Sequence, residues 1–210
     1  MDCNNKTTTF APKLKTQKSS NMKKVILVAA IAAFGFAAQA QTTYGPKAGV
    51  NISSLRGDDA DGLKSLVGFH FGGFVNLPIA ESLQVQPEVL FSTGGAKEGD
   101  VKLNMSYISI PVMVKYATTS GFFGEVGPQI GFLMSAKAKS GSESEDIKEY
   151  FKKTDFGAAI GLGYEHTSGF GGNVRYTLGL SNIGEAEGSD MKTGIFAIGL
   201  FYKLGKTAKK

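Results

Sequence analysis

The feature that most constrains the fold is an alternation of apolar and polar residues between Met105 and Ser135. The alternation stops at Ala117–Gly121 and then resumes with the even positions again mostly apolar. A side-chain period of two is typical of a β-strand with two unlike faces, so the segment predicts a β-hairpin. Its even-numbered apolar positions are Ile108, Ile110, Val112, Val114, Tyr116, Phe122, Val126, Ile130, Phe132 and Met134.

The same pattern recurs along the chain and predicts eight antiparallel strands of about ten residues, enough to cross a bilayer when tilted. Their connections alternate between short turns and long loops, as in bacterial outer-membrane barrels. A short helix is predicted at Asp146–Phe151. Besides the hairpin, strands are expected at 45–54, 65–77, 83–93, 154–166, 170–180 and 193–204; long loops at 56–64, 94–104, 137–153 and 181–192; and short turns at 78–82, 117–121 and 167–169.

The first forty residues predict export. Met22, Lys23 and Lys24 precede thirteen uncharged residues and an Ala-Gln-Ala sequence, the pattern of a signal peptide cleaved between Ala40 and Gln41. Thirteen residues are too few for a transmembrane helix, which needs about 20. Residues 1–21 are predicted to be a disordered extension or to precede the true start, 41–204 form the barrel, and 205–210 are a short tail.

Charge and cysteine content agree with this division. Residues 1–40 hold six of the 23 basic residues and one of the 18 acidic ones, so the remaining chain has 17 of each. Its zero formal charge gives no reason to expect nucleic-acid binding. The single cysteine, Cys3, lies in the predicted leader, so the barrel must be stable without disulfides.

The polar face of the strands indicates where they lie. It is rich in glycine, which suits the crowded interior of an eight-stranded barrel better than a solvated surface. The apolar face would then contact lipid. The inner glycines are Gly49, Gly68, Gly72, Gly127, Gly131, Gly157, Gly161, Gly163, Gly179 and Gly199, and the inner charges, which must pair, are Glu88, Lys115, Glu125, Asp155, Glu165, Arg175 and Lys203.

Lys115 and Glu125 are near-opposite across the short turn, which predicts a contact between them. Aromatic residues predict two girdles on the apolar face, as at the two interfaces of a bilayer. Tyr116, Phe122, Tyr164, Phe170 and Tyr202 lie beside the short turns, and Phe69, Phe91, Phe132, Phe156 and Phe196 lie nearer the long loops.

Four stretches of the chain resemble the PorT-type outer-membrane β-barrel domain, a relative of the small OmpX- and OmpA-like barrels. They are Tyr107–Tyr116, Gly124–Lys137, Asp155–Glu165 and Arg175–Ile183. The C-terminal Gly199, Tyr202 and Leu204 are similar to the sorting signal of such barrels but end in Leu and are followed by a tail. The resemblance implies fold and outer-membrane location and implies little about activity.

No catalytic, cofactor or metal site is predicted. His70 is expected to be a hydrogen-bonded interior residue, and the Glu165-His166-Thr167-Ser168 run lies at a turn on the opposite side of the membrane from lipid A. Arg56-Gly57-Asp58 resembles an integrin-type adhesion motif, but residues of turn-forming types occur together easily by chance, so no adhesion site is predicted there. Asp58, Asp59 and Asp61 lack the spacing of a calcium loop, although acidic loop residues could meet cations bridging lipopolysaccharide.

The sequence therefore predicts a monomeric, non-enzymatic outer-membrane barrel with no open pore and a structural or interaction role through its extracellular loops. Its expected partners are outer-membrane lipid and lipopolysaccharide, the barrel-assembly machinery and a protein at the loops. Two alternatives stay open: an exported soluble barrel that binds a small apolar ligand, and a lipid-A-modifying barrel enzyme.

Overall fold

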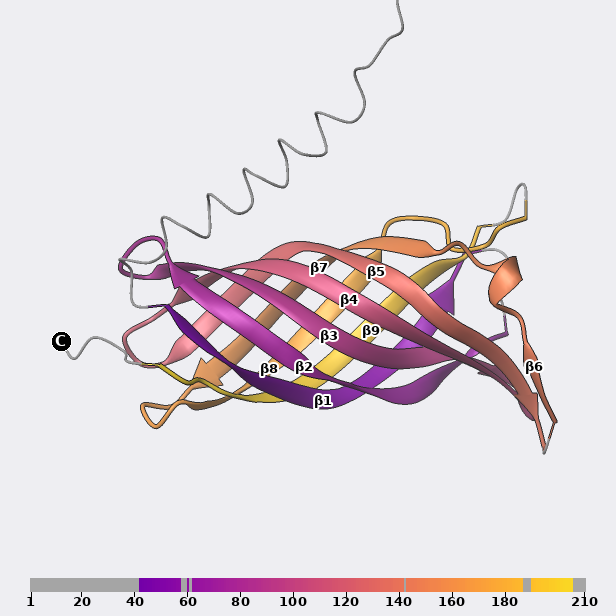
Figure 1. Ribbon diagram of the computed structural model, residues 1–210, viewed down its shortest axis with the longest axis horizontal. Helices are drawn as coiled ribbons and strands as arrows, with labels where there is room; N and C mark the ends of the chain where they lie inside the picture. Colours follow the sequence, from indigo (N-terminus) through magenta and orange to yellow (C-terminus); the bar gives the residue numbers. More distant parts are fainter. Residues whose placement is uncertain (1–41, 58–59, 61, 142, 187–189, 206–210) are drawn as a thin grey trace, which may run out of the picture. The chain divides into compact units, whose positions relative to one another are not determined.

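A computed structural model describes residues 42–57, 60, 62–141, 143–186 and 190–205 (Figure 1). The predicted leader lies outside these residues, and so do Asp58, Asp59 and Asp61 of the predicted loop at 56–64. The elements are β1 (Thr43–Arg56), β2 (Lys64–Pro78), β3 (Leu83–Glu98), β4 (Val101–Ala117), β5 (Phe122–Ser140), β6 (Glu143–Asp146), the 3-10 helix η3 (Lys148–Tyr150), β7 (Thr154–Glu165), β8 (Phe170–Gly179) and β9 (Lys192–Tyr202).

Eight of these strands close into an antiparallel barrel in which chain neighbours are sheet neighbours. The pairing of β1 with β9 joins the two ends of the meander, and β4 pairs with β5, so no edge is left in the ring. The short strand β6 pairs only with the far end of β5 and lies outside the ring. The predicted all-β, eight-stranded up-and-down barrel is confirmed.

The strands on one side run beyond the ring at the long-loop end, to the right in Figure 1. The predicted loop at 94–104 is wrong, because Gly95 to Glu98 pair in register with Val101 to Asn104. Gly99 supplies the left-handed turn with φ 54°. In the predicted helix at Asp146–Phe151 only η3 is helical. No helix among the described residues is long and apolar enough to cross a membrane.

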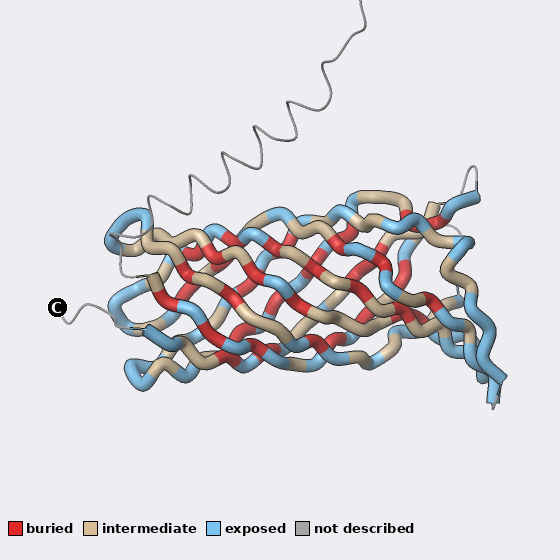
Figure 2. The backbone as a smooth tube through the Cα atoms, in the orientation of Figure 1, coloured by how far each residue is buried: buried red, intermediate tan, exposed pale blue. Residues whose placement is uncertain are grey.

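Burial alternates along the strands in the reverse of a soluble protein, as the red and pale-blue segments of Figure 2 show. Glu88 is 1% exposed, whereas its neighbour Val89 is 57% exposed. Lys115 is 1% exposed beside Val114 at 41%. Because a large exposed apolar surface is unfavourable in water, this wall is suited to contact with hydrocarbon.

The predicted crowding at the inner glycines is confirmed. A Cβ atom added at nine of the ten would lie closer than 3.0 Å to another atom, and at Gly131 it would lie at 3.3 Å. At Gly163 the obstacle is the ring of Phe123 at 2.2 Å. At six of these nine glycines the nearest atom is a backbone carbonyl oxygen, and at Gly163, Gly179 and Gly199 it is a side-chain atom. The glycines therefore allow close approach of both backbone and side chains.

Candidate functional site: the filled barrel interior

A buried ionic network occupies the middle of the barrel. Arg175 Nη1 and Nη2 donate to the two oxygens of Glu88 at 2.9 and 2.7 Å, and its Nε donates to Glu125 Oε1 at 3.0 Å. Lys47 Nζ lies 3.3 Å from Glu88 Oε1. These four residues come from β1, β3, β5 and β8, so the network ties together strands that are not neighbours in the sheet.

The network is balanced in charge and supported by amides. Two cations face two carboxylates, while Gln86 donates to Glu88 at 2.8 Å and Asn173 donates to Glu125 at 2.7 Å. Buried ions are tolerated when geometry is good and the remaining hydrogen-bonding groups are satisfied. The bidentate arginine–carboxylate contact is the strongest form of such a pair.

The interior leaves little free space. A cavity of about 30 Å³ lies beside His70 and Arg175, and one of about 20 Å³ lies nearer the long loops beside Tyr107. His70 is hydrogen-bonded as predicted, with Nδ1 2.8 Å from Asn51 Oδ1. Ligand pockets usually measure about 300–1,000 Å³. The polar, filled interior therefore disfavours the alternative of a soluble barrel around an apolar ligand.

Three phenylalanines, which we call the phenylalanine plug, close the interior at the short-turn end. The centroid of the Phe201 ring lies 5.7 Å from that of Phe74 and 6.1 Å from that of Phe123. Each ring lies opposite a glycine on the neighbouring strand, so the space above the missing Cβ is filled. The pairs are Gly45 with Phe74, Gly163 with Phe123, and Gly171 with Phe201.

The predicted Lys115–Glu125 pair is only half right. The two residues are in register, but Lys115 Nζ donates to Glu165 at 3.4 Å, and Lys203 also pairs with Glu165. Arg175 and Asn173 occupy Glu125 instead. Lys115 Nζ also lies 3.6 Å from the centroid of the Phe123 ring, a cation–π distance.

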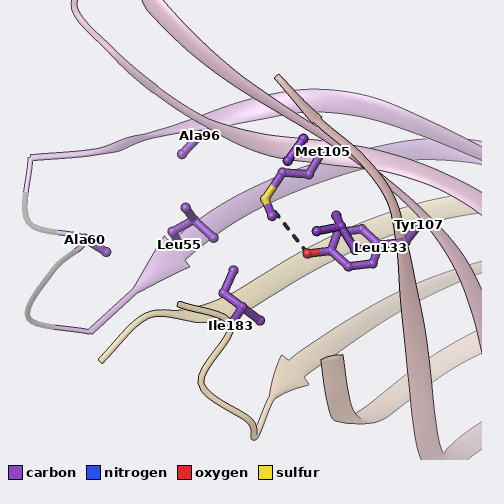
Figure 3. Close-up of a cluster of buried hydrophobic side chains, with 8 residues drawn as sticks. Leu55, Ala60, Ala96, Met105, Tyr107, Leu133 and Ile183 are labelled. Carbon is purple, nitrogen blue, oxygen red and sulfur yellow. Dashed lines mark hydrogen bonds between the residues drawn. The ribbon is translucent and has the colours of Figure 1, made fainter. Parts of the chain in front are cut away.

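At the long-loop end the interior changes from polar to apolar. Leu55, Met105, Leu133 and Ile183 form a buried cluster, which we call the mouth cluster (Figure 3). Tyr107 also belongs to it, and its hydroxyl oxygen lies 3.9 Å from the sulfur of Met105. Ile183 comes from the β8–β9 connection and packs with residues of the strands. Part of the long-loop region is thus folded into the mouth of the barrel.

The two sets of aromatic residues point outward as predicted. Next to the short turns the ring centroids of Phe122 and Tyr164 lie 5.0 Å apart and those of Phe170 and Tyr202 lie 4.6 Å apart, with the rings tilted against each other. Toward the long loops the ring centroids of Phe69 and Phe91 lie 6.3 Å apart. All ten are exposed or half-buried on the outer wall: Tyr116, Phe122, Tyr164, Phe170, Tyr202, Phe69, Phe91, Phe132, Phe156 and Phe196.

Sequence comparison now identifies the barrel. Residues 37–185 match the family described as outer membrane protein beta-barrel domain. The chain belongs to this family. It is an outer-membrane β-barrel, in agreement with the predicted location, and no curated protein matches its sequence.

Two solved structures are similar to this chain. Neisserial surface protein A is similar over 77% of this chain and 97% of its own, at 14% identity and a TM-score of 0.54. Ail, the attachment invasion locus protein of Yersinia pestis, is similar over 78% of this chain and 99% of its own, at 19% identity and a TM-score of 0.49. At such identities the likeness to neisserial surface protein A shows the fold alone.

The candidate catalytic run is not assembled in this outer-membrane barrel. His166 Nδ1 lies 2.9 Å from Ser168 Oγ at an exposed turn, with Thr167 between them. The acid of the run, Glu165, turns into the barrel and is held by Lys115 and Lys203. Among the described residues no group of three or more His, Cys, Asp or Glu could hold a metal ion.

Sequence reasoning placed most of the interior charges correctly but did not count Lys47 among them, although it put Lys47 on the polar face of the predicted strand 45–54. It also missed the three rings of the phenylalanine plug. The signal for Lys47 was present, because it alternates with Gly49 and Asn51 on the inner face of β1. The signal for the phenylalanines was weaker, since an aromatic residue opposite a glycine becomes visible only when the strand register is known.

Proposed function

We propose that this outer-membrane barrel is a non-conducting, non-enzymatic protein that acts through structure and through contacts made by its extracellular loops. The observation that carries the proposal is the Lys47–Glu88–Arg175–Glu125 network, which crosses the middle of the barrel. A side-chain network that spans the lumen leaves no continuous water path. The phenylalanine plug and the mouth cluster close the interior on either side.

The exposed long-loop end is the part of the barrel available for contacts. All four residues of β6 are exposed, and so is Tyr150 of η3. Aromatic residues such as Tyr150 are enriched at the centre of protein interfaces, and charged residues such as those of β6 suit the polar rim. We infer that such a partner binds here.

The finer family assignment and the route to the membrane belong to the same proposal. We propose that the barrel is of the PorT type and that its leader is cleaved between Ala40 and Gln41. The barrel-assembly machinery then inserts it as a monomer surrounded by outer-membrane lipid and lipopolysaccharide.

Fractionation combined with electrophoresis and single-channel recording tests the proposal. The native protein should co-sediment with outer membranes, migrate as a compact form that shifts on boiling, and have an N-terminus at Gln41. The purified barrel in planar bilayers should give no stable conductance. Release without detergent, or reproducible channel openings, would reject it.

A further inference from the structure

Four lysines face one another across four adjacent strands at the projecting long-loop end. Lys64 of β2 is in register with Lys97 of β3, which is in register with Lys102 of β4, which is in register with Lys139 of β5. Side chains in direct register lie on the same face, with Cβ atoms about 5 Å apart. We call these four residues the lysine row.

The lysine row points away from the barrel axis. Ala96 and Leu103, which alternate with Lys97 and Lys102, belong to or pack against the mouth cluster inside. Because successive side chains of a strand point to opposite faces, the lysines project from the outer side of the wall. This is the side that carries the exposed apolar residues Val67 and Met134 nearer the membrane.

The row has no neutralising partner within the described part of the chain, where none of the four lysines forms an ion pair. Glu98, Glu143 and Glu145 alternate with the lysines and therefore face the opposite way, in register with Val101, Ser140 and Ala138. Asp146 shares the face of the row but is in register with Lys137 and only diagonal to Lys139. Like charges directly opposite one another destabilise a sheet. The arrangement is favourable only when an anion neutralises it.

Two other lysines at the long-loop end each lie near a carboxylate. Lys137, two residues nearer the membrane on β5, has Asp146 opposite it on β6. Lys192 of β9, which is in register with Arg56 of β1, has its own partner in Asp190 at 2.9 Å. Among the residues described, no carboxylate is in register with any of the four lysines of the row, which distinguishes them from Lys137.

We propose that the lysine row binds the phosphate groups of the glycolipid, lipopolysaccharide, in the outer leaflet that surrounds the barrel. This inference rests on the outer-membrane placement proposed above. The row faces outward beyond the apolar wall, six residues along β3 and β4 from the outer-wall pair Phe91 and Ile108. This is the side on which lipid packed against the wall carries its phosphorylated headgroup. A row of four cations also suits a ligand that carries phosphates at both ends of a disaccharide. Each cation beside an anionic lipid surface strengthens binding by about fivefold.

Diphosphoryl lipid A and its dephosphorylated form serve as probes of the refolded, detergent-solubilised barrel. The Lys97→Gln, Lys102→Gln, Lys139→Gln triple variant should bind diphosphoryl lipid A at least about tenfold more weakly than the parent protein. A matched variant, Lys148→Gln, Lys152→Gln, Lys153→Gln, removes three lysines from the same end, two exposed and one half-buried, and should stay within about twofold. Dephosphorylated lipid A should not distinguish the three proteins.

The thermal unfolding temperature gives a second readout, in which removing the lysines and adding diphosphoryl lipid A to the parent should each raise the temperature. In phosphocholine micelles the triple variant should unfold at a higher temperature than the parent, because repulsion is relieved. Added diphosphoryl lipid A should stabilise the parent and leave the variant unchanged. A compact form that shifts on boiling shows that each protein is folded.

Equal loss of binding in both triple variants, or no loss in either, would overturn the proposal. Tighter binding of a heparin oligosaccharide than of diphosphoryl lipid A would overturn it too, since that outcome assigns the row to a soluble polyanion. If these outcomes occur with a protein that still fractionates with outer membranes, only the lysine row is misassigned. A protein that needs no detergent instead removes the proposed function itself.

Discussion

The inner and outer faces of the wall are built by the same strands, yet the inner face buries charged side chains and the outer face exposes apolar ones. The inner face buries charges such as Glu88 and Arg175, which need partners in fixed positions. The outer face exposes side chains such as Ile160 and Leu200, which need only an apolar solvent. The comparison teaches that specificity in this barrel is concentrated inside, because lipid accepts any apolar surface whereas a buried ion accepts few geometries.

The largest effect is expected where the inner face carries its network. Glu88→Gln leaves Lys47 and Arg175 without their shared carboxylate, so the free energy of unfolding should fall by about 3–5 kcal/mol. Denaturant titration of the barrel refolded in lipid vesicles measures it. Glu165→Gln is the control, since the Glu165 side chain is 19% exposed and water offsets part of the loss. Equal effects of the two substitutions would contradict the special role of the middle network.

The outer face is tested by placing a charge in it. Ile160 is 63% exposed near the middle of β7, so Ile160→Lys should lower the free energy of unfolding in lipid vesicles by about 2–4 kcal/mol. The reason is the transfer of an ammonium group into hydrocarbon. Tyr150→Lys, on η3 beyond the barrel wall, should have little effect. A neutral result for Ile160→Lys would mean that this face meets water.

A matched pair of glycines compares the two faces directly. Gly163 points inward, where a Cβ would lie 2.2 Å from the Phe123 ring, whereas at Gly124 on the outer wall the nearest atom would be 3.7 Å away. Gly163→Ala should therefore cost about 1–3 kcal/mol in the same titration, and Gly124→Ala should be close to neutral. Adding Phe123→Ala should relieve only part of the Gly163→Ala cost, because the Gly172 carbonyl oxygen would still lie 2.6 Å from the added Cβ. Similar losses at both glycines would show that the plug is not the cause.

The smallest effect on global stability is expected at the mouth cluster. Ile183→Ala should change the free energy of unfolding by less than about 1 kcal/mol, because the β8–β9 connection can open without the barrel unfolding. Trypsin cleavage after the exposed Lys152 and Lys153 should nevertheless become faster, since Lys152 N–H donates to the Ile183 carbonyl at 2.8 Å. Mass spectrometry of the fragments measures this. The control Leu180→Ala, on the outer wall, should leave the cleavage rate unchanged.

Particular residues show how far sequence reasoning reached into the candidate site. Glu88 and Arg175 were placed inside by their alternation with apolar neighbours, and their burial is confirmed. Their partners could not be assigned, because Arg175 reaches Glu88 and Glu125 across the barrel and not along the sheet. Cross-strand adjacency favoured Lys115 with Glu125, whereas contacts through the lumen paired Lys115 with Glu165.

The projecting long-loop end shows a second limit. Polar composition predicted a loop at 94–104, but hydrogen bonding between β3 and β4 continues to Glu98 and Val101. Exposed strands are polar on both faces, so they lose the alternation that reveals strands in the wall. The lysine row became visible only once that register was known.

The amino-acid sequence by itself determined the strand number, the up-and-down order and which face of each strand contacts lipid. These properties follow from a local period of two and from alternating short and long connections. Only the tertiary structure decided which interior charges meet, which ring covers which glycine, and that residues of the long-loop end fold into the mouth. Those contacts depend on closure of the ring and on register, which bring together side chains that no local pattern relates.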